Sequence, residues 1–135
     1  MAEARTLVAG TAEGPALVLD EPLSLWGGLD PETGSIIDTR HPQRGSTVAG
    51  RVLVMPAGRG SSSSSSVLAE AIRAGTGPAA IVLGEPDLIL ALGAIVAREL
   101  FGTSIPVVVT AESGLRTDDL ITVRADESGV ELLRW

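Results

Sequence analysis

The sequence predicts an α/β domain with a parallel-sheet core and two helices, flanked at both ends by β-rich, barrel-like segments. Three observations support this prediction. Apolar runs at residues 51–55, 79–83 and 105–109 alternate with two helical patterns, the order that produces right-handed crossovers between parallel strands. Short apolar runs separated by turn residues stand before and after this central part. The length of 135 residues suits one domain, residues 1–135.

The first half of the chain is expected to form short strands joined by turns. The segments RTLVAG (residues 5–10) and PALVL (residues 15–19) have the composition of strands. A loop-rich stretch follows at residues 20–46, because glycine, proline and polar residues interrupt every apolar run there. RVLVM, residues 51–55, is mostly apolar and β-branched, which predicts a strand covered on both faces.

Two segments between the apolar runs have helical periodicity. The first, residues 62–74, begins with serines and carries its apolar residues on one stripe before Gly75, a C-terminal cap. The second spans residues 86–100 and ends at Gly102. Residues 120–135 then predict a closing hairpin around the turn DESG. Four apolar residues of the second helix are expected to face inward: Leu88, Leu92, Ile95 and Val96.

The composition argues against several classes of function. The formal charge is −7 and every basic residue is arginine, which disfavours nucleic acid and anionic membranes as partners. No apolar run is long enough to span a bilayer, and residues 1–10 lack the apolar core of a secretory signal, so a cytoplasmic location is expected. The chain has no cysteine, so any iron–sulfur cluster must be bound by another chain.

The stretch AGRGSSSSSS, residues 57–66, allows two interpretations. Serine and glycine tracts are commonly solvated linkers. Here, however, the run lies directly between an apolar strand and an amphipathic helix. Serine hydroxyls cap helix N-termini, glycines let the backbone approach a ligand, and the helix dipole favours negative charge there. We therefore interpret the stretch as a site for a carboxylate or phosphate, although it matches neither the P-loop nor the Rossmann pattern.

A serine in this loop could also act chemically, because nearby N–H donors stabilise charge on its oxygen. A Ser-His-Asp hydrolase is one such possibility, with His41 as the base and Asp30 or Asp38 orienting it. The surroundings of the serines lack the G-x-S-x-G pattern of hydrolases. We therefore disfavour the hydrolase.

Two longer segments resemble a known family. LSLWGGLDPETGSIID, and HPQRGSTVAGRVLVMPAGRGSSSSSSVLAEAIRAGTGPAAIVLGEPDLILALGAIVARELFGTSIPVV after it, resemble the small subunit, or swivelling domain, of the aconitase X family. The resemblance runs from about Leu23 to Val108. It implies a swivelling β/β/α fold and a hydro-lyase whose large subunit carries an iron–sulfur cluster or related metal site. This chain would bind no cofactor itself, and its partners would be the large subunit and a small hydroxy acid.

The resemblance also implies roles for the loop residues. Ser61, the first serine after GRG, corresponds to the serine base of aconitase-like enzymes. The residues expected to bind the substrate carboxylate or to stabilise the serine alkoxide are Gly58, Arg59, Gly60 and Ser62. The uninterrupted serine run departs from the family pattern, which leaves the roles of residues 63–65 open.

The motif WGGLDPETG is a further candidate element. Turn chemistry alone predicts a tight turn with Trp26 filling the core. The resemblance implies instead that this loop lines a cleft closed against the large subunit. The candidate cleft residues are Trp26, Gly27, Gly28, Asp30 and His41.

The resemblance implies dehydration of either cis-3-hydroxy-L-proline or mevalonate 5-phosphate. Both eliminations need a base for a carbon-bound proton and a Lewis acid for the departing hydroxyl. We favour cis-3-hydroxy-L-proline, because arginine without lysine and abundant alanine and glycine are typical of GC-rich bacterial genomes. Phosphomevalonate dehydratase is the alternative enzyme. A non-catalytic module that holds an anion or a partner at the same helix N-terminus is the alternative of another class.

Overall fold

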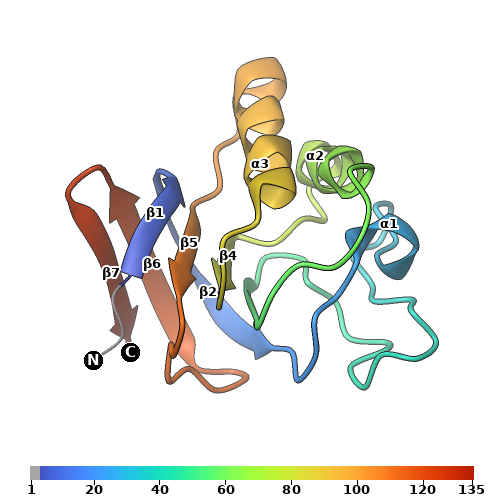
Figure 1. Ribbon diagram of the computed structural model, residues 1–135, viewed down its shortest axis with the longest axis horizontal. Helices are drawn as coiled ribbons and strands as arrows, with labels where there is room; N and C mark the ends of the chain where they lie inside the picture. The colour runs from blue at the N-terminus through green and yellow to red at the C-terminus, as the bar shows by residue number, and fades with distance from the viewer. Residues whose placement is uncertain (1–3) are drawn as a thin grey trace.

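The computed structural model describes residues 4–135, which form seven strands and three helices (Figure 1). This architecture confirms the predicted α/β fold with a parallel core. The strands are β1 (Ala4–Val8), β2 (Gly10–Val18), β3 (Val52–Met55), β4 (Ala80–Leu83), β5 (Val107–Thr110), β6 (Leu120–Asp126) and β7 (Gly129–Arg134). The helices are α1 (Leu25–Gly28), α2 (Ser64–Ala74) and α3 (Leu88–Phe101).

One mixed sheet organises these elements, in the order β1-β5-β4-β3-β2-β6-β7. Strands β2, β3, β4 and β5 are parallel, as expected from the alternation of strands and helices. Strand β1 pairs antiparallel with β5, and the hairpin β6–β7 pairs antiparallel with β2. The sheet curls until its two ends meet, where Thr6 Oγ1 donates to the carbonyl oxygen of Asp126 at 2.8 Å. The predicted barrel-like flanks are therefore one nearly closed sheet.

The central strands are buried on both faces, which confirms the prediction for residues 51–55. Side chains alternate along a strand, so Leu53 and Ile81 face the helices whereas Val52 and Val82 face the barrel interior. The three helices cover one face, and the hairpin β6–β7 curls towards the other (Figure 1). Two apolar layers thus hold β3, β4 and β5 in place, and the loops at the strand ends start from a rigid frame.

Both long helices end as predicted, with Gly75 and Gly102 in the left-handed conformation at φ of 80° and 73°. The predicted inward stripe of α3 is wrong for Leu88 and Leu92, which are 76% and 52% exposed, whereas Ile95 and Val96 are partly buried against the core as expected. The helix is apolar on nearly all sides, so periodicity could not identify its core face. Small residues decide that face instead. The core side consists of Leu90, Ala91, Gly93, Ala94 and Ala97.

The remaining parts agree with expectation in outline. Residues 20–46 are mostly loop, although α1 forms a short kinked turn within them. Residues 120–135 form the closing hairpin. No helix within residues 4–135 has both the length and the apolarity needed to cross a membrane.

Candidate functional site

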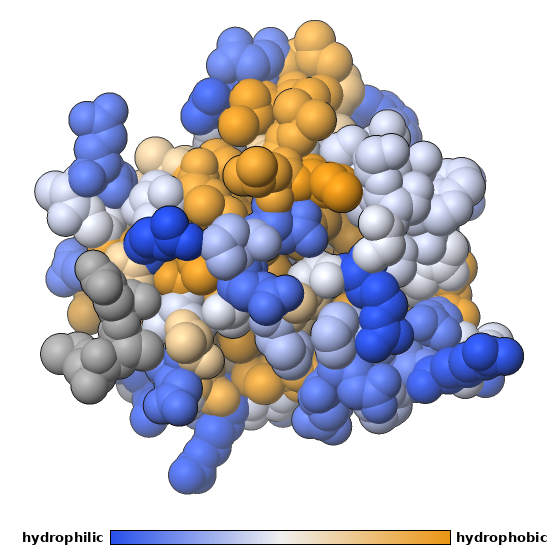
Figure 2. All heavy atoms as spheres, viewed as in Figure 1, coloured by the Kyte–Doolittle hydropathy of each residue, from blue (hydrophilic) through white to orange (hydrophobic). Residues whose placement is uncertain are grey.

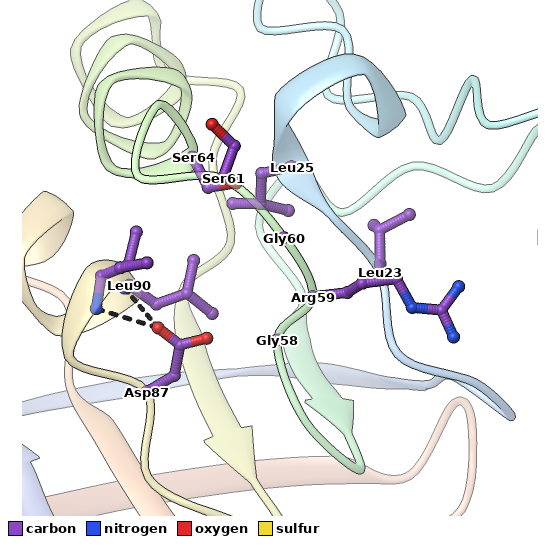
Figure 3. A pocket seen from close by; sticks show the side chains of 10 residues that line it. Leu23, Leu25, Gly58, Arg59, Gly60, Ser61, Ser64, Asp87 and Leu90 are labelled. Atoms are coloured by element: carbon purple, nitrogen blue, oxygen red, sulfur yellow. Dashed lines mark hydrogen bonds between the residues drawn. The ribbon is translucent and has the colours of Figure 1, made fainter.

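The serine run lies at the carboxyl end of β3, where residues 56–63 lead into α2. Carboxyl ends of parallel strands meet at one edge of a sheet, so the loop after β4 lies beside it. The two loops enclose a hollow of about 10 Å³, which has room for roughly one water molecule. Figure 3 shows Ser61 on the α2 side of this hollow and Asp87 on the α3 side. Gly58, Arg59, Gly60 and Ser64 also line it.

Two glycines let this loop turn sharply and approach its neighbours. Gly60 has φ of +102°, and a Cβ there would lie 2.8 Å from Ser24 Oγ. A Cβ on Gly58 would lie 2.0 Å from Asp87 Oδ2. Neither position accepts a larger residue without movement. The loop therefore passes close to Ser24, which precedes α1, and to Asp87, which precedes α3.

Ser61 begins the helical turn that becomes α2. Its Oγ accepts from the amide of Ser63 at 3.1 Å, and its carbonyl oxygen accepts from the amide of Ser64 at 2.9 Å. Within residues 4–135, the amides of Ser61 and Ser62 donate to no other protein atom. The Ser61 hydroxyl thus lies at the positive end of the helix dipole, where negative charge on an oxygen is favoured.

Two of the serines whose roles the sequence left open, Ser64 and Ser65, form side-chain hydrogen bonds that stabilise the loop. Ser64 is buried, and its Oγ accepts from the amide of Trp26 at 3.2 Å. Ser65 Oγ donates to the carbonyl oxygen of Ser62 at 2.8 Å. The first hydrogen bond joins the start of α2 to α1, and the second stabilises the turn that leads into α2.

Arg59 and Ser62 are exposed beside the hollow. In the described part of the chain, Arg59 forms no ion pair. Its side chain extends past Leu23, away from Ser61 (Figure 3). Arg59 is therefore free to reach an anion that approaches from outside the chain.

The WGG turn flanks the hollow without lining it. Trp26 is 60% exposed, so it does not fill the core. Gly27 is exposed with φ of +78°, and Gly28 is buried where a Cβ would lie 2.9 Å from Leu23 Cδ1. The exposed indole leaves Trp26 available to another molecule.

Asp30 and His41 belong to local turns outside the hollow. Asp30 Oδ1 accepts from the amide of Glu32 at 2.9 Å. His41 is buried; its Nδ1 accepts from the amide of Gln43 at 3.0 Å, so its Nε2–H donates to the carbonyl oxygen of Glu21 at 3.1 Å. Both ring nitrogens are thus occupied, and His41 pairs with no serine as a hydrolase base would.

Asp87 is a site residue that the sequence analysis missed. Its Oδ1 accepts from the amides of Ile89 and Leu90 at 2.9 and 3.0 Å, which caps α3. Its Oδ2 faces Gly58 across the hollow. The signal was present, since an aspartate directly before an apolar helix is a common N-cap. Its position beside the serine loop follows only from the order of the parallel strands.

The donor set of this chain does not suit a metal cluster. The sequence has no cysteine, and residues 4–135 contain no group of three His, Asp or Glu side chains placed to hold an ion. The hollow presents serine hydroxyls, the Arg59 guanidinium and the Asp87 carboxyl group.

Comparisons with known proteins place this geometry in context. Residues 1–132 match a family model described as the aconitase X swivel domain. The chain is 54% identical over 116 residues to the cis-3-hydroxy-L-proline dehydratase of Pseudomonas aeruginosa, covering 86% of this chain and 20% of that protein. It is 41% identical over 130 residues to the phosphomevalonate dehydratase small subunit of Thermococcus gammatolerans, covering 96% and 95% of the two chains.

A solved structure agrees closely with the fold. The structure of Thermococcus kodakaraensis aconitase X in its holo-form superposes with a TM-score of 0.86 at 39% identity, covering 98% of this chain and 97% of that one. The chain spans only 20% and 17% of the hydroxyproline dehydratases of Pseudomonas aeruginosa and Hypocrea jecorina. It therefore corresponds to one segment of those longer proteins and to nearly the whole of the archaeal small subunit.

Proposed function

The chain belongs to the aconitase X swivel-domain family, and from this premise we propose that it is the small subunit of a dehydratase that acts on a small hydroxy acid. The relatives support this proposal, because they are named as dehydratases or as dehydratase small subunits. The size of the hollow also supports it. About 10 Å³ cannot enclose a hydroxy acid, so a substrate that meets Ser61 lies between this chain and a large subunit.

We assign the proton-abstracting role to Ser61. In the proposed step, its oxygen takes a proton from the carbon next to the hydroxyl-bearing carbon of the substrate. The electron pair of that C–H bond forms the new double bond, and the C–O bond breaks so that the hydroxyl leaves with its electron pair. A proton from solvent converts the leaving hydroxide to water, and Ser61 returns the proton that it took to solvent, so that the sum is one alkene and one water. The observation that supports this role is the position of Ser61 Oγ at the start of α2, bonded to the amide of Ser63 at 3.1 Å. That environment favours the alkoxide form.

The other loop residues have supporting roles in this proposal. Arg59 is exposed and forms no ion pair within residues 4–135, and its planar guanidinium suits a substrate carboxylate. The amides of Ser61 and Ser62 donate to no other atom of the described chain, so they are available as donors to an anion. The metal centre belongs to the large subunit in this proposal, and it would supply the Lewis acid for the departing hydroxyl.

For the substrate we favour cis-3-hydroxy-L-proline. The identity of 54% to the bacterial enzyme supports it, against 41% to the archaeal small subunit. Mevalonate 5-phosphate stays the second candidate, because the archaeal small subunit matches this chain over 95% of its own length. A phosphate would place two anionic groups near one exposed arginine. The loop amides could accept one of them.

The test is turnover by the complex of this chain with its large subunit, assayed on both hydroxy acids. We expect the complex to dehydrate one of them and the isolated chain to dehydrate neither. Ser61→Ala should lower kcat by about 10²- to 10⁴-fold, the usual effect of losing a general base. Ser66→Ala is the matched control, since Ser66 is an exposed serine of the same run.

Each outcome decides a separate point. Full activity of Ser61→Ala in an intact complex would remove Ser61 as the base and leave the loop as a binding element. No turnover of either substrate by an intact, metal-loaded complex would contradict the dehydratase and favour an anion-binding or interaction module.

A further inference from the structure

A cavity lies at the mouth of the barrel, beside the loop that leads from β5 to β6. Each of four parallel strands contributes a residue near its carboxyl end to the lining, namely Val18, Val54, Val82 and Thr110. Val54 and Val82 belong to the apolar layer inside the barrel, and Val18 packs against that layer. Crevices at the carboxyl ends of parallel strands are common ligand sites in α/β sheets, so the position of this cavity favours a binding site.

The cavity is separate from the hollow beside Ser61. Its volume is about 210 Å³, against about 10 Å³ for the hollow, and no residue lines both. It also lies apart from the apolar side chains that gather over α3 (Figure 2), because no residue of that helix lines it. Drug-sized ligands occupy sites of about 300 to 1,000 Å³, so this cavity suits a smaller molecule with only a few carbon atoms.

Thr110 supplies a polar group that faces this cavity. The residue is only 5% exposed, and its side chain points into the barrel because it alternates with Val109, which packs under the helices. Within residues 4–135 its hydroxyl forms no hydrogen bond, yet the oxygen is not sealed from open space. Buried polar groups normally have a hydrogen-bond partner. A ligand in the cavity would supply the partner that Thr110 lacks in the described chain.

The lining of the cavity carries no charge. None of the described residues that line it is Asp, Glu, Lys, Arg or His. Apart from Thr110, the lining side chains are apolar except for Ser113, whose Oγ accepts from the amide of Leu115 at 3.2 Å. A charged ligand would lose its hydration here without gaining an ionic partner, which is costly. The ligand that fits this lining is therefore uncharged.

We propose that the cavity is a binding site for a small uncharged molecule that has an apolar body of a few carbon atoms and one hydroxyl or carbonyl group. The apolar body lies against Val18, Val54 and Val82, and its oxygen bonds to the hydroxyl of Thr110. The site is independent of the proposed dehydratase function, because the two candidate hydroxy acids are charged and Ser61 lies outside the cavity.

The test titrates the ¹⁵N-labelled chain with methyl isopropyl ketone and follows the amide resonances by NMR. We expect saturable shifts at Gly84, Ala111 and Ser113, which line the cavity, with a dissociation constant in the millimolar range for so few atoms. Isobutyrate has the same isopropyl and carbonyl groups but carries a charge, so it should bind at least tenfold more weakly. Shifts that never saturate would overturn the site, and equal binding of isobutyrate would overturn the assigned class of ligand.

Thr110→Val tests the hydroxyl, because valine keeps the shape of threonine and removes its oxygen. Binding of the ketone should weaken about three- to tenfold, and Thr110→Ser, which restores a hydroxyl, should recover most of the affinity. Thr11→Val is the matched control, since Thr11 is an exposed threonine of β2 that does not line the cavity. Thermal unfolding verifies the fold of each variant. Equal affinities of the wild type and a folded Thr110→Val would show that Thr110 does not bind the ligand and would overturn the proposal.

Discussion

Gly58 and Asp87 meet across the hollow and set the path of the serine loop. Asp87 Oδ1 accepts hydrogen bonds from two amides of α3. A Cβ on residue 58 would lie 2.0 Å from Asp87 Oδ2. The carboxyl group therefore limits how closely the loop that carries Ser61 can approach α3. In the proposed reaction, Asp87 would therefore be a positioning residue, which acts through the loop and not on the substrate.

A double-mutant cycle tests the contact. Gly58→Ala should lower kcat of the assembled enzyme about tenfold or more, because the loop must shift. Asp87→Ser keeps a capping oxygen for α3 but removes Oδ2, so Gly58→Ala in that background should cost much less. The measurement is kcat of the four proteins with their unfolding temperatures as control. Additive losses would show that the contact does not position Ser61.

The sequence analysis identified the loop residues but not the residues that contact the loop in the fold. Ser61 and the glycines stand out because serine, glycine and the strand-to-helix transition are local signals. Asp87 and Ser64 act through contacts that join α3 and α1 to this loop, and such contacts depend on the order of strands in the sheet. His41 and Trp26 show the same limit, since burial of the histidine and exposure of the indole are set by packing.

At the scale of secondary-structure elements, helix α2 packs closely against helix α3. A Cβ on Gly93 would lie 2.7 Å from the carbonyl oxygen of Ser65, so glycine lets the two helices touch. Gly93→Ala should lower the free energy of unfolding by about 1 to 2 kcal/mol, because the clash outweighs the gain of about 1 kcal/mol in helix propensity. Urea unfolding measures it. Leu100→Ala, an exposed change on the same helix, should change it by less than about 0.5 kcal/mol, and equal losses would contradict the packing argument.

The contribution of the β6–β7 hairpin turn to the stability of the fold is expected to depend on pH. Hydrogen bonds from the Ser128 hydroxyl and amide, and from the Gly129 amide, hold the pKa of Asp126 below its ordinary value. A carboxyl group with a lowered pKa stabilises the fold above its unfolded pKa, and that contribution is lost as pH falls through the folded pKa. Ser128→Ala should therefore raise the Asp126 pKa. Carboxyl chemical shifts measure it, and an unchanged titration would contradict the assigned cause.

Secondary-structure elements were predictable where the sequence pattern indicated only one type of structure. The central strands are β-branched and apolar, and the helices end at glycines, so their existence and ends followed from the residues. The face of α3 did not follow, because Leu88 and Leu92 stand on its outer side, whereas Leu90 shares the inner side with alanines and a glycine. Close packing between helices favours small residues on the buried face. The sequence analysis instead assigned the buried face from the positions of large apolar residues.

At the scale of the whole molecule, the fold presents the start of α2 on one edge of a rigid sheet and leaves it half enclosed. Alternating strands and helices predicted the parallel core, but closure of the sheet depends on contacts between its distant ends, such as Thr6 with Asp126. The serine loop and Arg59 lie together on the outside of this sheet. A half site of this kind is expected in a chain that works as a cap on a larger partner.

Proton transfer in the assembled complex tests the central claim most directly. In deuterium oxide, the wild-type complex should place deuterium from solvent on the substrate carbon during the reverse, hydration reaction, followed by NMR. Ser61→Asn keeps an oxygen that can accept from the Ser63 amide but has no hydroxyl to take the proton, so deuterium incorporation and dehydration should both fall at least 100-fold, whereas Ser66→Ala should match the wild type. Wild-type rates of both in the Ser61→Asn complex would contradict the assignment of Ser61 as the base.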